Sequence, residues 1–200
     1  MALLFANNNS LSAITTKPSG LSGGAMNLIS TQTASSSSTI SFTSGIDSTY
    51  DEYVFKFYDI HPATDQANFT VNFRDGSTAY DATKTTTCFA AFHQEDDGDA
   101  ELLYAGGRDL AQSTGVQNIA GSVGNDNDQS ISGYLFLFKP SSTTFVKHFI
   151  CKTSYTEASN QAWTQNVAGY CNTTTAIDGV QFSFDSGNID SGVIKLYGIS

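Results

Sequence analysis

From Thr39 onward, apolar and polar side chains alternate with a period of two residues, and this pattern restricts the chain to β-structure. In the segment Ala67 to Arg74 (ANFTVNFR), every second residue is apolar, and Asn, Thr and Arg occupy the positions between. Successive side chains of a strand point to opposite faces of a sheet, so the pattern predicts a strand with one buried face. The segment Val180 to Asp185 shows the same alternation and is a second such strand.

Two segments are apolar at both sets of alternating positions: Glu52 to Ile60 (EYVFKFYDI) and Ile131 to Phe138 (ISGYLFLF). A strand with two apolar faces is typical of a position covered on both sides, so we expect these two strands at the centre of the fold. β-branched and aromatic residues, which favour strands, dominate several other segments. These further candidates are Thr39–Thr43, Thr86–His93, Thr144–Cys151, Ala162–Tyr170 and Val193–Ile199.

Helix signals are weak throughout the chain. Leucine spacing suggests a helix only in Asp99 to Leu110, where Gly106 and Gly107 limit it to one or two turns. Short strands separated by turns, without intervening helices, predict an all-β fold, an antiparallel β-sandwich of jelly-roll-like type. A chain of 200 residues is long enough to bury its own core as one such domain.

The first 38 residues differ in composition from the rest and predict an extended N-terminal arm, followed by the β-sandwich domain at 39–200. The arm is rich in Ser, Asn and Gly, and it ends in the run Ser35 to Ser38. Such a segment cannot bury enough apolar area by itself to offset the entropy lost on ordering. Its two apolar stretches, Leu3–Phe5 and Ala25–Ile29, are candidates for docking on this or a neighbouring subunit. A terminus that touches nothing is the alternative.

The charge balance excludes two classes of partner. The chain has 9 Lys and Arg against 19 Asp and Glu, a net charge of −10, which repels phosphate backbones and anionic lipid headgroups. We therefore expect no binding to nucleic acid or to a membrane. No apolar run approaches the roughly 18 residues that span a bilayer. The N-terminus lacks the basic and apolar regions of a secretory signal, which predicts synthesis in a cytoplasm.

No residues form a recognisable catalytic, cofactor-binding or metal-binding motif, so we predict a protein that is not an enzyme. His61 precedes a proline and is expected in a turn, and His148 is expected as a partly buried, hydrogen-bonded side chain of a strand. A pair of carboxylates brought together from distant strands for glycoside hydrolysis stays open, although nothing in the sequence supports it.

The three cysteines, Cys88, Cys151 and Cys171, show no metal-ligand spacing, and their odd number argues against a complete set of disulfides. Each lies in strand-like sequence. Free cysteine is among the most buried residue types, so we expect three buried, reduced thiols.

Two acidic loops are candidate calcium sites. The segment His93 to Glu101 concentrates five carboxylates in nine residues, and Gly124 to Gln129 is a second polar loop. Calcium prefers clusters of oxygen ligands, but neither segment has the spacing of an EF-hand loop. We therefore favour a solvated acidic turn in both places, since salt screens exposed like charges.

Trp163 and the residues around it raise the question of sugar binding. Tyr155, Asn160 and Tyr170 lie nearby in the sequence, and flat aromatic rings can stack on sugars while amides bind hydroxyl groups. Most aromatic residues of an all-β protein pack in its core, however, so we favour packing for Trp163.

Three stretches of the sequence resemble a known group of proteins. They are ISFTSGIDSTYDEY with the following FKF and IHP (within residues 40–62), GYLFLFKPSS (133–142) and SGNIDSGVIKLYGI (186–199). Together they resemble structural proteins of tailed bacteriophages, of the type found in marine and cyanobacterial phages. The resemblance covers most of residues 39–200 and implies a β-sandwich module of a virion. It carries no site residue over to this chain.

The resemblance and the composition together lead us to expect a bacteriophage virion structural protein. The favoured role is a homotrimeric capsid decoration or cement protein that binds the major capsid protein and stabilises the outer surface. The alternative is a tail or fibre component that recognises host-surface glycans. Sandwich modules of this kind occur in both places, so the resemblance does not choose between them.

Overall fold

The computed structural model describes residues 25–200, and in this part of the chain every regular element is a β-strand. The twelve strands are β1 (Met26–Ser37), β2 (Ile40–Phe42), β3 (Glu52–Pro62), β4 (Ala67–Arg74), β5 (Lys84–Gln94), β6 (Ala100–Tyr104), β7 (Gln117–Val123), β8 (Ile131–Phe138), β9 (Lys147–Glu157), β10 (Gln161–Cys171), β11 (Gly179–Phe184) and β12 (Ile189–Ile199). Residues 25–200 contain no helix that could cross a membrane.

Eight of the strands have the topology of a jelly roll. One group has the order β1-β12-β3-β8 and the other the order β2-β11-β4-β7. Every neighbouring pair in both groups is antiparallel. Each group interleaves early and late strands of the chain, as two Greek keys wound together require. The predicted all-β, antiparallel, jelly-roll-like sandwich is therefore confirmed.

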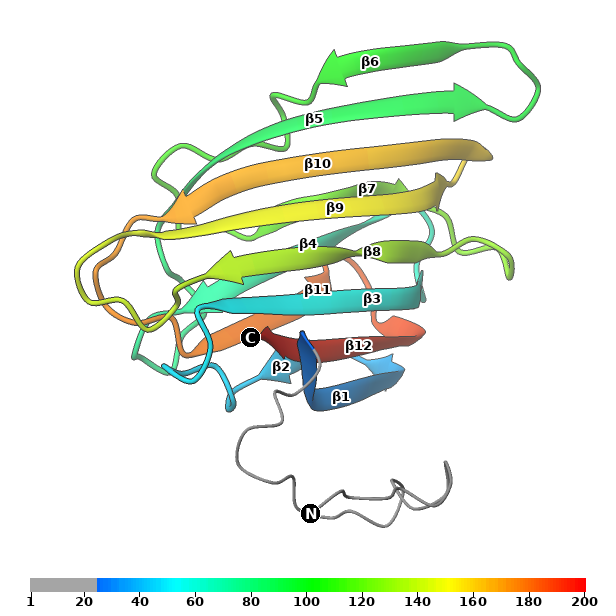
Figure 1. Cartoon of the computed structure of the whole chain (residues 1–200). Helices are drawn as coiled ribbons and strands as arrows, with labels where there is room; N and C mark the ends of the chain where they lie inside the picture. Colours follow the sequence, from blue (N-terminus) through cyan, green and yellow to red (C-terminus); the bar gives the residue numbers. More distant parts are fainter. Residues whose placement is uncertain (1–24) are drawn as a thin grey trace, which may run out of the picture.

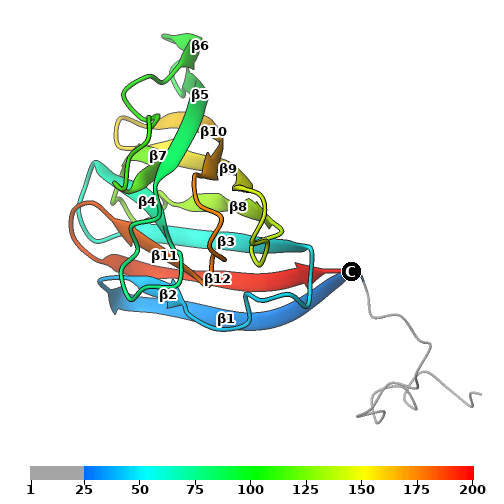
Figure 2. The same cartoon turned by 90° about the vertical axis from the view of Figure 1, so that its left-hand side faces the viewer.

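Two inserted hairpins extend the first group of strands. The hairpin β9–β10 adds to β8, and the hairpin β5–β6 adds to β10. The result is an eight-stranded sheet, β1-β12-β3-β8-β9-β10-β5-β6, which we call the large sheet; β2-β11-β4-β7 is the small sheet. Figure 1 shows the small sheet behind the large one, and Figure 2 shows the large sheet from the side. One residue pair, Val123↔Glu157, connects the two sheets through β7 and β9.

The aromatic core lies between the two sheets, and Phe182 of β11 is its central residue. Its ring meets Phe55 and Phe57 of the large sheet in edge-on contacts, with ring centroids 5.5 and 5.1 Å away. Within the small sheet it contacts Phe42 and Phe69, at centroid distances of 6.3 and 5.9 Å. All five side chains are at most 2% exposed. One side chain therefore joins four strands from both layers.

The two strands predicted at the centre do lie there, but only one of their faces is covered. β3 and β8 are neighbours in the middle of the large sheet. Their inward residues, such as Phe55 and Leu135, are fully buried. In residues 25–200 no layer covers the opposite side of the large sheet, which we call the outer face (Figure 1). The apolar residues that suggested two covered faces are therefore partly open to solvent.

The boundary predicted at residue 38 lies too far along the chain. Residues Met26–Ser37 form β1, which pairs with β12 over almost its whole length. The sandwich therefore begins near residue 25 and includes the last third of the predicted arm. Main-chain hydrogen bonds hold an edge strand even when its side chains are polar, which explains why the Ser-rich run gave no strand signal.

The apolar stretch Ala25–Ile29 docks on its own domain, since Ile29 packs against the core. The other stretch proposed for docking, Leu3–Phe5, lies outside the described residues.

The strands β6 and β7 were not predicted either. The segment considered for a helical turn, Asp99 to Leu110, instead contains β6, which pairs with β5 as a hairpin. Cross-strand hydrogen bonds outweigh the weak helical preference of the sequence AELLY here. β7 (QNIAGSV) is short of the large β-formers that mark the other strands, although five of its seven residues are buried.

The aromatic core gives a direct test of the fold. Replacing Phe182 by Ala removes edge-on contacts to both sheets and leaves a cavity, so we expect Phe182→Ala to lower the free energy of unfolding by about 3–5 kcal/mol. The matched control is Phe145→Ala, because Phe145 is 72% exposed in a loop, and it should change stability by less than about 0.5 kcal/mol. Urea titration followed by circular dichroism measures both. Equal losses for the two variants would contradict the described core.

Candidate functional site

The outer face of the large sheet concentrates the exposed apolar surface of the molecule. Ten large hydrophobic side chains are exposed in residues 25–200, and two of them, Val116 and Phe145, lie in loops. The other eight belong to strands of the large sheet and alternate with its buried residues: Met26, Leu28, Tyr58, Phe89, Leu102, Tyr104, Tyr134 and Ile150. Single exposed apolar residues are ordinary, but a contiguous apolar face marks a surface that binds another molecule.

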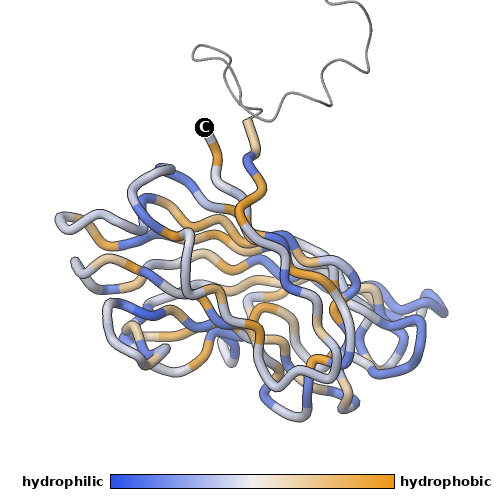
Figure 3. The backbone as a smooth tube through the Cα atoms, turned by 90° about the horizontal axis from the view of Figure 1, so that it is seen from below, coloured by the Kyte–Doolittle hydropathy of each residue, from blue (hydrophilic) through white to orange (hydrophobic). Residues whose placement is uncertain are grey.

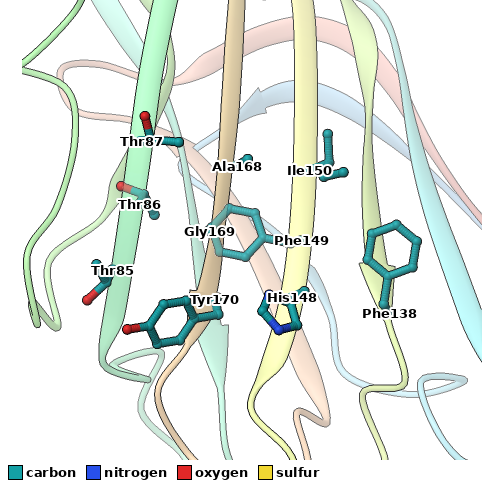
Figure 4. Close-up of a pocket in the computed structure, with 10 residues that line it drawn as sticks. All are labelled: Thr85, Thr86, Thr87, Phe138, His148, Phe149, Ile150, Ala168, Gly169 and Tyr170. Carbon is teal, nitrogen blue, oxygen red and sulfur yellow. The ribbon is translucent and has the colours of Figure 1, made fainter.

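The outer face also contains two shallow apolar depressions. The first, about 570 Å³ in volume, lies over β5, β10 and β9, and includes Ile150, Ala168 and Tyr170 in its lining (Figure 4). The second, about 450 Å³, lies over β1, β12, β3 and β8 and includes Val54 and Phe136. Both are open to solvent along the sheet. Their shape suits side chains of a docking protein better than a small molecule that needs enclosure.

An aromatic row follows β8 between the two depressions. The rings of Tyr134 and Phe136 meet edge-on with centroids 5.2 Å apart, and those of Phe136 and Phe138 stack at 6.3 Å. Large rigid rings contribute contact area at a small loss of side-chain entropy, as in many protein interfaces. The outer face therefore has the composition of an assembly surface.

The histidines do not converge on one site. His148 is exposed on the outer face beside Tyr170, with ring centroids 5.9 Å apart, rather than partly buried and hydrogen-bonded as predicted. A register that places Lys147 and Phe149 inward turns His148 outward. His61 lies at the end of β3 rather than in a turn, with its ring nitrogen Nε2 3.2 Å from the main-chain oxygen of Asp126.

Trp163 is a packing residue and has no free ring face for a sugar. Tyr155 of β9 and Phe92 of β5 are its cross-strand neighbours on opposite sides. Both rings are nearly parallel to the indole, with centroids 6.2 and 4.8 Å away. The guanidinium of Arg108 lies 5.2 Å from the indole centroid and donates a hydrogen bond to Gln165 Oε1.

The acidic loop from His93 to Glu101 forms the exposed turn between β5 and β6. The loop from Gly124 to Gln129 joins β7 to β8 at the same end of the strands. In residues 25–200, no three His, Cys, Asp or Glu side chains come together as a metal site requires. In Figure 3 the hydrophilic stretches lie largely in such loops, away from the apolar strands.

All three cysteines are free and buried, as predicted. Burial raises the pKa of the Cys88 thiol to about 11, that of Cys171 to about 12, and that of Cys151 further still. These thiols are therefore protonated and unreactive at neutral pH.

A buried polar row that the sequence did not reveal crosses the inner face of the large sheet. Lys84 and Lys147 flank Cys171 in register, and neither lysine is accessible to solvent. The amine of Lys84 donates hydrogen bonds to Asn72 Oδ1 at 2.5 Å and to the carbonyl of Ala82 at 2.7 Å. Burial lowers the pKa of Lys84 to about 8. Because neither lysine is accessible to solvent, we interpret this buried Lys84–Cys171–Lys147 group as structural.

Comparison with family models, with curated proteins and with solved structures gave no match. The resemblance to phage structural proteins therefore stays a prediction.

The buried Lys84 predicts a specific pH dependence of stability. Its pKa is about 8 in the folded chain and 10.5 in an exposed lysine, so between these pH values the unfolded chain binds more protons. The contribution of Lys84 to stability therefore rises with pH across this window. We expect Lys84→Met to be more stable relative to the parent near pH 7.5 than near pH 10.5, by up to about 3 kcal/mol.

Urea titrations of both proteins at the two pH values measure this change. The exposed substitution Phe145→Ala, which changes no titrating group, serves as the control, and its stability difference should not vary with pH. A difference for Lys84→Met that stays constant with pH would contradict the burial of a titrating amine.

Proposed function

We propose that this chain is a structural protein of a tailed-bacteriophage virion, namely a capsid decoration or cement protein that binds the outer capsid surface and stabilises it. In this proposal the chain associates with itself as a homotrimer and with the major capsid protein. The outer face of the large sheet is the single observation that carries the proposal. An apolar sheet face without a covering layer is a surface for adhesion between subunits.

The position of the resembling stretches supports the same role. Residues 40–62 contain β3, residues 133–142 contain most of β8, and residues 186–199 contain β12. These three strands are neighbours in the large sheet. The stretches that resemble phage structural proteins therefore build three adjacent strands in one half of the large sheet, and the first stretch also contains β2 of the small sheet.

The alternative, a tail or fibre component that recognises host glycans, has less support. Trp163, the residue that motivated it, lies between two other aromatic rings. The exposed aromatic residues of β8 are part of a broad apolar face rather than of a polar cleft that would select a sugar.

The location of the chain in purified particles tests the proposal. We expect mass spectrometry of capsid and tail fractions to recover the chain with capsids, and electron microscopy to place a β-sandwich on the outer shell. Recovery in tail fractions only would replace the decoration role by the alternative. Absence from both fractions would remove the virion role altogether.

The outer face can be tested by substitution in the same system. Ile150→Asp and Leu28→Asp each place a charge among exposed apolar residues, and we expect them to reduce incorporation into particles at least about tenfold while the fold is retained. Phe145→Asp is the matched control, since Phe145 is exposed outside the outer face. Normal incorporation of both outer-face variants would contradict the assembly role of this face.

A further inference from the structure

Three lysines form one row across the outer face. In the register of the large sheet, Lys195 of β12 lies opposite Lys56 of β3, Lys56 lies opposite Tyr134 of β8, and Tyr134 lies opposite Lys152 of β9. These four residues, which we call the lysine row, occupy adjacent strands about 4.8 Å apart. A chain with a net charge of −10 thus places three of its few cations side by side.

The lysine row has no acidic partner in residues 25–200. No carboxylate oxygen lies within ion-pair distance of Lys56, Lys152 or Lys195 in this part of the chain. Like charges directly opposite each other on neighbouring strands destabilise a sheet, and Lys56 and Lys195 form such a pair. The Lys195 amine lies 5.4 Å from the Tyr58 ring centroid, a weak substitute for an anion. The arrangement is favourable only when an acidic group lies against it.

The depression of about 450 Å³ adjoins the lysine row, and Lys56 and Tyr134 belong to its lining. Glu52 also belongs to the lining, and apolar residues such as Val54 and Phe136 make up most of the rest. A ligand of the row therefore meets the lysines beside a mainly apolar hollow that contains one carboxylate. The fitting partner carries carboxylates next to exposed apolar side chains.

The β5–β6 hairpin of the same chain has this composition. Its turn contains Glu95, Asp96, Asp97 and Asp99, all exposed. Two apolar residues of the following strand, Leu102 and Tyr104, are 73% and 60% exposed. Among the strands of residues 25–200, β6 pairs only with β5 and forms the far edge of the large sheet, where the hairpin lies clear of the small sheet (Figures 1 and 2).

We infer that the lysine row and its neighbouring depression bind the β5–β6 hairpin of a second copy of this chain. The inference rests on the proposed function, because it names the partner of the assembly surface. The hairpin does not lie on the row of its own chain, since both belong to one sheet and two to six strand spacings, about 10–29 Å, separate their strands. The contact is therefore between copies.

The contact joins two different patches of the same face, and each copy carries one of each. A closed ring such as a trimer pairs them head to tail, and a twofold dimer pairs them reciprocally.

Charge reversal with compensation tests the contact on the purified full-length chain. The row variant carries Lys56→Glu, Lys152→Glu and Lys195→Glu, and the hairpin variant carries Glu95→Lys, Asp96→Lys and Asp99→Lys. We expect analytical ultracentrifugation to show self-association of the parent that weakens with salt. Each triple variant should raise the dissociation constant about 100-fold. The single variants Lys139→Glu and Asp128→Lys, which lie in loops outside the contact, are the controls and should associate like the parent.

Two further samples test whether the lysine row of one copy meets the hairpin of another. A chain with all six changes should regain association, since its acidic row meets a basic hairpin. An equimolar mixture of the two triple variants should form mixed pairs, because the row of each variant is opposite in charge to the hairpin of the other. A mixed ring of three retains one contact between like charges, so the mixed pairs are what is measured if the sixfold variant fails to fold. A monomeric parent, unchanged association of either triple variant, or no recovery in the mixture would overturn the inference.

These outcomes are separate from those of the proposed function. If the charge-reversal results contradict the contact, the proposed virion role is unaffected. If the chain is absent from particles, the virion role is removed, but the contact between copies can still be confirmed.

Discussion

The contact of Phe182 with both sheets is the interaction on which the rest of the structure depends. Its edge-on contacts to Phe55 and Phe57 connect β11 of the small sheet to β3 of the large sheet. Apart from the single pair that links β7 to β9, the layers share no strand pairing, so side-chain packing holds them together. Because β3 is fixed from inside in this way, its outward residues are held in position on the outer face.

The sequence predicts the fold class well, because a strand that packs one face on the core has an apolar residue at every second position. The alternation in Ala67–Arg74 and Val180–Asp185 corresponds to β4 and β11, whose apolar residues fill the core. Strands held mainly by backbone pairing leave no such signal, which is why β1 was interpreted as an arm. The register of the strands decides which residues lie next to each other on a face. It depends on pairing between segments far apart in the chain, so it cannot be predicted from a single sequence.

The same limit applies to the outer face. Apolar residues on both sides of β3 and β8 indicate that both sides tend to be covered, and the sequence alone suggests a second layer of the same molecule. In the structure, that layer is missing from residues 25–200. The misinterpretation is informative, because it identifies an apolar side that residues 25–200 leave open. The lysine row was invisible for a related reason, since Lys56, Lys152 and Lys195 become neighbours only through the register.

The pairing of β1 with β12 brings the two ends of the described chain together at one corner. The main-chain nitrogen of Ser200 donates a hydrogen bond to the carbonyl of Ala25, at 3.1 Å. A short linker between these residues would close the backbone without disturbing either sheet. Opening it elsewhere, in an exposed loop, would give a circular permutant of residues 25–200 with the same jelly roll and a new choice of attachment point for a fused protein.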